Sequence, residues 1–360
     1  MKVTPDLSQG MVSALLSFLR QELGCPRLRY ERAPHLIATG TEAQIIGFSV
    51  AGAARFRGPM VLRLSVDPDY PLQPMLEHAV HQAVIAQGFP APPVHFFSND
   101  GAELGRPFLI MGDMTQMPPV GLLQRWTQRM RSLLRRRPPV KFAQSQVKPP
   151  ELLVKLLASL HELDGEPLLK AFATAGVPRP AMLGQRRYQQ TLEIVERWEL
   201  RPLQPLMKWL KEGRPALKRP SICHGDPHVG NLILSGSHVN AMIDWSGAQI
   251  GDPEADLGLI CGYRRCHEDP AADPSGTSLD RDLLDSYGRC RGYDEKRVRY
   301  YEAELLISFM ASVGDQVHRR LAHLNPPPNP ILDDPRTMDR LGARLRQLVP
   351  AGVRVPLSWV

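Results

Sequence analysis

Hydrophobic residues in the first third of the chain follow the pattern of β-strands. Residues 35–50 and 59–66 are rich in Ile, Val and Phe and are joined by turns that contain Gly and Ala. Residues 106–114 form one more short apolar stretch. These segments predict an antiparallel sheet near the N-terminus.

Two segments of the same region have the spacing of helices instead. Residues 72–88 carry apolar side chains at helical intervals and end at Gly88, a helix stop. An earlier amphipathic stretch follows Asp6 and stops at Gly24. The sheet and these helices predict a small α+β lobe that covers residues 1–113.

Beyond this lobe the pattern is mostly helical. Residues 150–164, 188–213 and 300–324 are each predicted as an amphipathic helix. Between them, residues 231–236 and 239–245 are short β-like pieces separated by a Gly-Ser turn. We therefore expect a helical C-terminal lobe, residues 114–360, with a small hairpin at its centre.

Composition is that of a globular protein with two lobes. The chain has 360 residues, of which 43% are hydrophobic, enough to bury a sizeable core. No run of eighteen apolar residues occurs, and the apolar stretch near the N-terminus lacks a cleavage site, so we expect a cytoplasmic protein with no stable membrane insertion. Five thinly spread cysteines predict reduced thiols.

The net charge of +7 raises the question of an anionic partner. Eight basic and no acidic residues lie between Asp113 and Glu151, all of them in the basic segment 125–148. Apolar residues recur there at helical spacing, which favours a packed helix with a solvated charged face. Binding to an anionic membrane surface stays open as the alternative, and nucleic acid is not the partner that we expect.

The segment HGDPHVGN, residues 224–231, concentrates the polar chemistry of the chain. His224 and His228 are four residues apart, as in the zinc motif H-E-x-x-H. Gly225 and Pro227 disfavour the helix that this motif needs, and its glutamate is absent. The pattern therefore argues against a zinc hydrolase.

Oxygen ligands fit the same segment better. A loop followed by a hairpin would bring Asp226, Asn231 and Asp244 to one rim. Carboxylate and amide oxygens suit Mg²⁺ more than Zn²⁺. This favours phosphate chemistry.

Three linked motifs, HGDPHVGN, IDW and GDPEADL, follow one another at close spacing. In this they resemble the protein-kinase-like phosphotransferases of the aminoglycoside phosphotransferase and choline kinase branch. That branch carries H-G-D-x-H-x-x-N, then I-D-W or I-D-x, then G-D-P-x-x-D-L. The resemblance covers about residues 36–256, including LASLHELD, and implies a bilobal protein-kinase-like fold.

The resemblance also implies roles for single residues. Asp226 would orient the substrate hydroxyl and accept its proton, while Asn231 and Asp244 would hold Mg²⁺ against the nucleotide phosphates. Four further residues would support the catalytic loop: His224, His228, Asp252 and Asp256. Of these, His224 is expected to fix the loop by hydrogen bonding.

A nucleotide site is expected in the first lobe. Arg63, on the strand VLRL, takes the place of the family's lysine, and Glu77 at the start of the next helix would hold it. Gly40 and Thr41 lie in the turn that would cover the phosphates, although the turn is poor in glycine. The nucleotide would be ATP, with GTP as an alternative.

These observations predict Mg²⁺-dependent transfer of a nucleotide γ-phosphate to a hydroxyl of a small molecule. No segment resembles the activation loop of protein kinases, which argues against a protein acceptor. The alternative function is a catalytically weak kinase-fold protein that binds an anionic partner through the basic segment. The acceptor stays open: the acid-rich residues 268–285 could line a pocket for a polycation or form a solvated loop.

Overall fold

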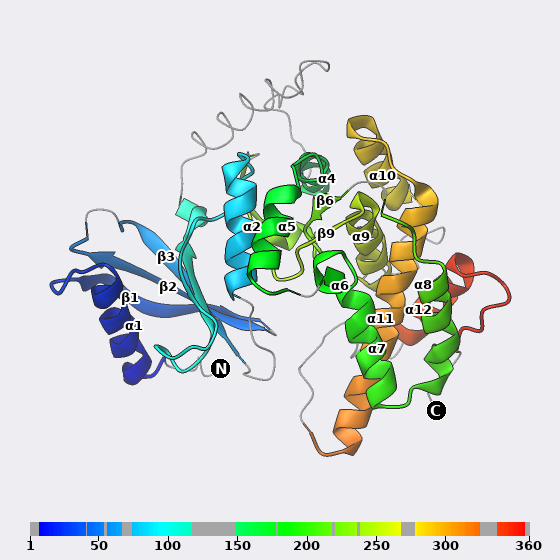
Figure 1. Cartoon of the computed structure of the whole chain (residues 1–360), viewed down its shortest axis with the longest axis horizontal. Helices are drawn as coiled ribbons and strands as arrows, with labels where there is room; N and C mark the ends of the chain where they lie inside the picture. The colour runs from blue at the N-terminus through cyan, green and yellow to red at the C-terminus, as the bar shows by residue number, and fades with distance from the viewer. Residues whose placement is uncertain are drawn as a thin grey trace. The chain divides into compact units, whose positions relative to one another are not determined.

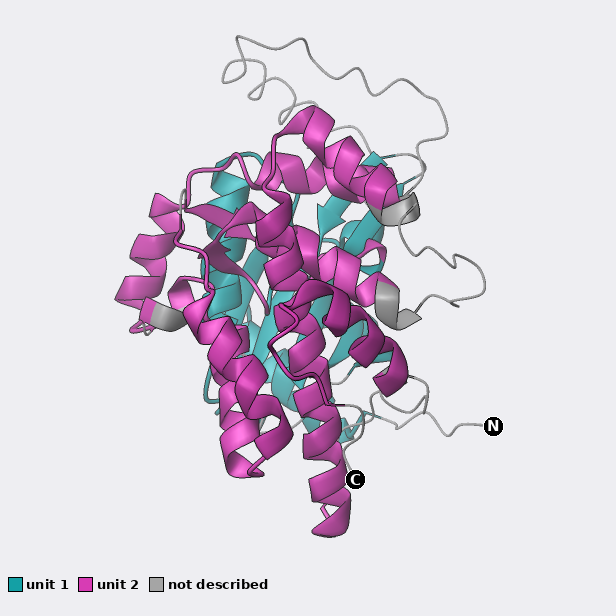
Figure 2. Cartoon of the chain, turned by 90° about the vertical axis from the view of Figure 1, so that its right-hand side faces the viewer, with its two compact units in different colours: residues 1–146, 230–246 teal, residues 147–229, 247–360 magenta. Residues whose placement is uncertain are grey.

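The computed structural model divides the chain into two compact units, residues 1–146 with 230–246 and residues 147–229 with 247–360 (Figure 2). It describes residues 7–40, 42–53, 56–66, 74–116, 149–177, 179–217, 220–235, 238–267, 278–324 and 337–356. The basic segment 125–148 lies outside the described residues. The predicted lobe boundary at residue 113 stays a prediction.

The first unit contains a five-stranded antiparallel sheet, as predicted (Figure 1). Its strands in spatial order are β1 (Arg29–Thr39), β2 (Ala43–Ala51), β3 (Pro59–Ser65), β5 (Phe108–Gly112) and β4 (Val94–Ser98). Ile45 of β2 and Leu109 of β5 pair with Arg63 of β3. Because side chains alternate along strands, Arg63 faces away from the neighbouring Leu62 and Leu64.

Two helices pack on this unit. Helix α1 (Gln9–Glu22) is capped by the Ser8 side chain and buries Leu15 and Leu19 in the cluster that contains Leu62 and Leu64. Helix α2 (Pro74–Ala86) presents Glu77 to Arg63 on the other face of the sheet. The alternating pattern of β3 thus separates an apolar core from a charged centre.

The hairpin β7 (Leu232–Ser235) and β8 (His238–Met242) belongs to the first unit, not to the helical part in which it was expected. The Met242 amide donates to the Pro90 carbonyl at 2.9 Å, and Asn240 Nδ2 donates to the carbonyl of Met114, in the short helix η1 (Met114–Gln116), at 3.2 Å. Trp245, 1% exposed, packs its ring against Phe89 with 5.8 Å between centroids. Burial of this large aromatic side chain explains the assignment.

The second unit is built mainly of helices. Its elements are α4 (Pro149–Leu160), α5 (Glu166–Thr174), α6 (Arg179–Met182), α7 (Arg186–Arg197), η2 (Arg201–Leu203), α8 (Gln204–Glu212), α9 (Pro253–His267), α10 (Ser278–Cys290), α11 (Glu295–Leu321) and α12 (Thr337–Leu348), with the paired strands β6 (Ser221–Cys223) and β9 (Gln249–Gly251). Helix η3 (Val229–Asn231) leads from this unit into the hairpin.

Helix α11 lies at the centre of the second unit's core. Its inner face joins an apolar cluster with α7, α8 and α12. Gly258 of α9 lets that helix approach closely, because a Cβ there would lie 2.6 Å from the Glu302 amide nitrogen. The tight crossing of α9 on α11 fixes the start of α9, which carries Asp256 and follows directly after Asp252.

One predicted helix is interrupted. Residues 188–213 were expected as a single amphipathic helix, but α7 ends at Arg197 and α8 begins at Gln204. Glu199 has a φ of 47°, and Pro202 and Pro205 lack the amide hydrogens that a continuous helix needs. Apolar periodicity runs across this break, which is why the pattern alone did not reveal it.

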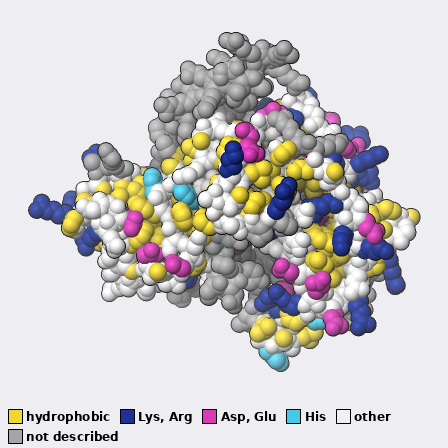
Figure 3. Space-filling view, viewed as in Figure 1, with side chains coloured by type: hydrophobic (Ala, Val, Ile, Leu, Met, Phe, Trp, Pro, Cys, Tyr) yellow, Lys and Arg dark blue, Asp and Glu magenta, His cyan; other side chains and the backbone are white. Residues whose placement is uncertain are grey.

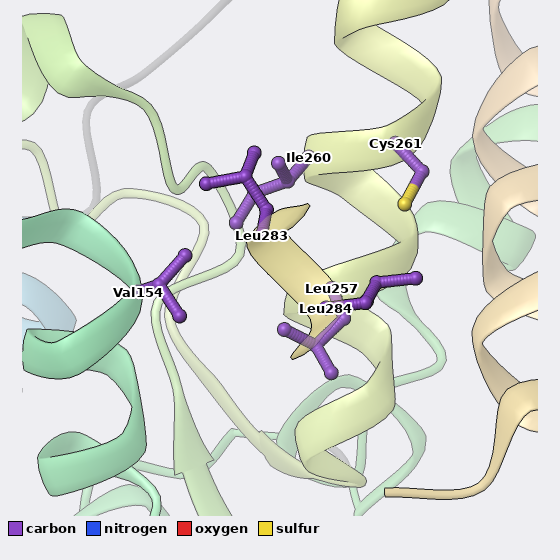
Figure 4. A pocket seen from close by; sticks show the side chains of 6 residues that line it. All are labelled: Val154, Leu257, Ile260, Cys261, Leu283 and Leu284. Carbon is purple, nitrogen blue, oxygen red and sulfur yellow. The ribbon is translucent and has the colours of Figure 1, made fainter. Parts of the chain in front are cut away.

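Packing between α4, α9 and α10 leaves almost no space. Six side chains converge there: Val154, Leu257, Ile260, Cys261, Leu283 and Leu284 (Figure 4). They enclose about 10 Å³, an apolar void at the lower limit for one water molecule. This region therefore stabilises the fold and offers no ligand site.

Among the described side chains on the face shown in Figure 3, Lys and Arg are interspersed with Asp and Glu. In the part of the chain that the structure describes, no helix is long and apolar enough to cross a membrane.

Candidate active site

Arg63 is the centre of a charged cluster in the first unit. Its Nη1 lies 2.9 Å from Glu77 Oε2 and 2.9 Å from Asp244 Oδ1. Its Nη2 lies 3.2 Å from Glu42 Oε2. We call these four residues the Arg63 centre. The contact with Glu42 was not foreseen from the sequence.

Electrostatics keep the Arg63 guanidinium charged. Burial alone would lower its pKa, but the carboxylates of Glu77, Asp244 and Glu42 outweigh that effect and raise the pKa above its ordinary value. Three carboxylates face one cation, so the centre has a formal excess of negative charge. A further cation beside it would be stabilised.

The members of the Arg63 centre differ in exposure. The side chains of Arg63 and Glu77 are 7% and 2% exposed, whereas those of Asp244 and Glu42 are 38% and 52% exposed. The inner pair is therefore fixed in the protein. The outer carboxylates can exchange partners with a ligand.

Asp244 and Asn231 lie at the same open end of the hairpin. The Ile243 amide donates to the Asn231 carbonyl at 2.9 Å, which aligns the residues on either side. Asp244 has a φ of 64°, a left-handed conformation that Asp tolerates better than most residues. An amide and a carboxylate side chain meet the preference of Mg²⁺ for oxygen ligands, so this donor set fits that ion.

The β1–β2 turn gives limited support to a phosphate loop. The Gly40 amide donates to the Ala43 carbonyl at 2.8 Å and closes the turn. Thr41, predicted beside it, lies outside the described residues. Glu42 is the turn residue that reaches Arg63.

A cavity of about 190 Å³ lies over the sheet face that carries Arg63. Gly47 and Ser49 line it, and they share that face because they pair with Val61 and Pro59. The His35 ring fills the space above Gly47, where a Cβ would lie 2.8 Å from a ring carbon. The cavity is a small mixed polar and apolar recess.

The loop that contains Asp226 is held by backbone contacts in the second unit. Gly225 has a φ of 80°, and a Cβ there would lie 1.9 Å from the Gly247 carbonyl oxygen. The Asp256 carboxylate accepts from the amides of His224 and Gly225 at 2.8 and 2.9 Å. Only glycine fits position 225 in this arrangement.

Asp256 is itself anchored by His161, whose Nε2 lies 3.0 Å from Asp256 Oδ2. Burial would raise the pKa of Asp256, but the hydrogen bond and charge of His161 contribute to lowering it below its ordinary value. The carboxylate therefore stays ionised and keeps accepting the loop amides.

Asp226 combines partial exposure with polar neighbours. Its side chain is 31% exposed, and Oδ2 lies 3.5 Å from His228 Nε2. Burial would raise its pKa, but the hydrogen bond and charge of His228, together with a hydrogen bond from Tyr263, lower it. The His224 Nδ1 accepts from the Asp226 amide at 3.3 Å. Asp226 is thus an ionised carboxylate on a fixed loop.

Asp252 was expected to support the loop that contains Asp226, but its side chain has other partners. Its Oδ2 accepts from Arg297 Nη1 at 2.6 Å and from the Tyr301 hydroxyl at 2.8 Å. These bonds join the start of α9 to α11. Its backbone carbonyl accepts a weaker bond from the Cys223 thiol at 3.2 Å.

Two residues beside the loop that contains Asp226 were not found from the sequence. Arg187 Nη2 donates to the Gly225 carbonyl at 3.2 Å, and Tyr263 bonds the Asp226 side chain. Neither belongs to a motif, because each reaches the loop from a helix whose rotation only the packing decides.

Comparisons with protein families and with known structures both find phosphotransferases. Residues 48–301 match the model of a family described as "Phosphotransferase enzyme family". Over 194 residues the chain is 26% identical to acyl-CoA dehydrogenase family member 10 of Mus musculus, a match that covers 51% of this chain and 16% of that much longer protein.

Solved structures share the fold over nearly the whole chain. A proposed aminoglycoside phosphotransferase from Ralstonia eutropha JMP134 is 17% identical, with a TM-score of 0.56 and coverage of 93% of this chain and 95% of that one. A thermostable mutant of aminoglycoside phosphotransferase APH(4)-Ia, solved as a ternary complex with ADP and hygromycin B, is 15% identical, with a TM-score of 0.51 and coverage of 92% of this chain and 98% of that one. The predicted kinase-like α+β fold is confirmed.

Proposed function

Since the chain belongs to the phosphotransferase enzyme family, we propose that it transfers the γ-phosphate of ATP or GTP, with Mg²⁺, to a hydroxyl of a small molecule. The Arg63 centre is the observation that carries this proposal. It offers a buried, permanently charged guanidinium beside an exposed carboxylate, the pairing that a phosphate and its metal ion need.

Different residues would bind the nucleotide phosphates and the metal ion. Arg63 would pair with phosphate oxygens, while Glu77 keeps its guanidinium in place. Asn231 and Asp244 would hold Mg²⁺, which supplies neutralisation of phosphate charge when bound. The exposed Glu42 would give up its place at Arg63 to the nucleotide.

Asp226 would act on the acceptor. An ionised carboxylate with a lowered pKa orients a hydroxyl by accepting its hydrogen bond and takes its proton during transfer. The contacts of Gly225 with Gly247 and of the loop amides with Asp256 keep it in place, so little reorganisation is needed.

The nucleotide base would occupy the part of this cavity beside the His35 ring, which covers Gly47. The recess lies on the Arg63 face of the sheet, and its mixed polar and apolar lining suits a planar base. That APH(4)-Ia forms a complex with ADP supports a nucleotide here, although its hygromycin B says nothing of the acceptor of this chain.

The test is a screen of hydroxylated metabolites and antibiotics for Mg²⁺-ATP or Mg²⁺-GTP consumption, followed by the Asp226→Asn variant. We expect turnover of the best acceptor to fall by a factor of roughly 10² to 10⁴ in this variant, the range for loss of a general base. Asp339→Asn, an exposed change of equal charge on α12, is the control. Unchanged turnover in Asp226→Asn would refute the proposal.

A further inference from the structure

A second cavity lies wholly within the helical unit and has no role in the function proposed above. It has a volume of about 300 Å³. Its walls come from the α6–α7 turn, the segment after α8, the β9–α9 turn and Tyr301 of α11. Pockets of this size accept small metabolites.

Arg214 gives this cavity a positive charge. Its Nη2 donates to the Gly184 carbonyl, and its Nη1 lies 3.4 Å from Glu304 Oε1. A guanidinium has five N–H donors, so these two contacts, which are its contacts among the described residues, leave three donors for a ligand.

The carboxylate near Arg214 is that of Glu304, which is buried. Burial raises the pKa of Glu304 above its ordinary value, in spite of the opposing effects of Arg214 and Arg187. Two guanidinium groups, those of Arg214 and Arg187, thus act on the Glu304 carboxylate.

The carboxylate that lines the cavity, that of Asp252, already has hydrogen-bonding partners. Asp252, 3% exposed, is bonded to Arg297 and to the Tyr301 hydroxyl. Leu217, Ala255 and the other apolar residues make much of the remaining wall. A cation would find no available carboxylate among the described lining residues, whereas an anion would find Arg214.

The cavity adjoins the catalytic loop from two sides. Gln249 lines it and lies two residues after Gly247, which touches Gly225. Gln185 also lines it and lies two residues before Arg187, which bonds the Gly225 carbonyl. The cavity lining is therefore two residues along the chain from each of two groups that contact Gly225, the residue before Asp226.

We propose that this cavity binds the acceptor through a carboxylate or phosphate group that pairs with Arg214. The acceptor of the reaction is then an anionic, hydroxylated small molecule and not a polycation. The assignment to the acceptor rests on the proposed function, whereas the preference for anions can be measured without any phosphoryl transfer.

Three sugars of nearly equal shape test the charge preference: glucuronate, glucose and glucosamine. Binding to the full chain is measured by saturation-transfer NMR titration without nucleotide. We expect glucuronate to bind at least about tenfold more tightly than glucosamine, because it gains a charge-assisted hydrogen bond. Absence of glucuronate binding, or equal affinity for glucosamine, would overturn the inference.

Variants locate the binding. Arg214→Gln should lower glucuronate affinity to that of glucose, with Arg201→Gln, an 81% exposed arginine, as the matched control. Leu217→Trp should block binding by filling the cavity while the charges stay, with Leu321→Trp, 72% exposed, as its control. Glucuronate binding that survives both cavity variants would exclude this site.

The two proposals can fail separately. If Asp226→Asn keeps its turnover while glucuronate binds as expected, the catalytic proposal falls and the anion site stands. If the screen instead finds a polycationic acceptor whose KM is unchanged by Arg214→Gln, the inference on the acceptor falls and the transfer activity stands.

Discussion

Two arginines are buried to the same degree in the two units but have different surroundings. The Arg63 side chain is 7% exposed and that of Arg297 is 9% exposed. Arg297, its close and buried partner Asp252 and the Tyr301 hydroxyl are joined by hydrogen bonds, and we call them the Arg297 centre. The exposed carboxylate near Arg297, that of Asp294, lies farther away, at 3.8 Å from Nε. In the Arg63 centre, by contrast, two of three carboxylates reach solvent.

This difference separates a structural ion pair from one that can bind ligands. Exchange of an exposed carboxylate for a phosphate or metal ion costs little desolvation, because the group can return to water. Removal of a partner from a closed pair leaves a buried charge, which is costly. The informative property is the exposure of the carboxylates in direct contact with the guanidinium, since burial of the cation is alike in the two centres.

The largest effect is expected from the Arg297 centre. Arg297→Met would leave the buried Asp252 without its cation and lower the free energy of unfolding by about 3–5 kcal/mol. Urea denaturation followed by circular dichroism measures this. Arg201→Met, at an exposed position, should change stability by no more than about 0.5 kcal/mol. Similar values for both variants would remove the distinction.

Asp244→Asn tests the ligand-binding side of the comparison. Asparagine tolerates the left-handed backbone of this position, so we expect a change in unfolding free energy within about 1 kcal/mol. The apparent affinity for Mg²⁺ in the transfer reaction should fall at least about tenfold. Calorimetric titration of Mg²⁺ with the nucleotide-bound protein checks the binding directly, with Asp339→Asn as control. A stability loss without a metal effect would make Asp244 structural.

Glu304 is buried, and the arginines near it, Arg214 and Arg187, only partly offset the effect of burial on its pKa. Its raised pKa means that the folded protein binds the proton more tightly than the unfolded chain between the ordinary value and the raised one. Stability should therefore fall as pH rises through this window, and Glu304→Gln should remove that part of the slope. Urea midpoints of both proteins from pH 5 to 8 measure it. Parallel slopes would show that Glu304 is ionised normally.

The smallest effect is expected at Glu42. Glu42→Gln removes an exposed partner of Arg63 and should lower the KM for the nucleotide by a factor of up to about 5, the range for an exposed ion pair. The free energy of unfolding should not change measurably. A rise in KM would instead mean that Glu42 helps to hold the nucleotide.

Local sequence patterns predicted the elements of the fold and several site residues. Arg63 and Glu77 were chosen through the resemblance to kinases, and the structure pairs their side chains at 2.9 Å. The long helix α11 and the sheet followed from apolar periodicity. These features depend on interactions over short distances along the chain.

Features set by tertiary packing could not be predicted in this way. The pair β6–β9 has three residues per strand, too few for a pattern. The membership of the hairpin in the first unit depends on where Trp245 is buried. Arg187 and Tyr263 reach the catalytic loop only through the rotation of their helices. Asp252 matched a motif, but its partners lie on α11, far along the sequence.

The amides of His224 and Gly225 have a consequence for the study of this loop. Both are bonded to the buried Asp256 carboxylate, so they should exchange with deuterated solvent only when the loop opens. Their exchange rates would report the closed lifetime of the loop in the resting protein. Any compound that enters the neighbouring cavity could then be recognised by slower exchange at these two positions, before its chemistry is known.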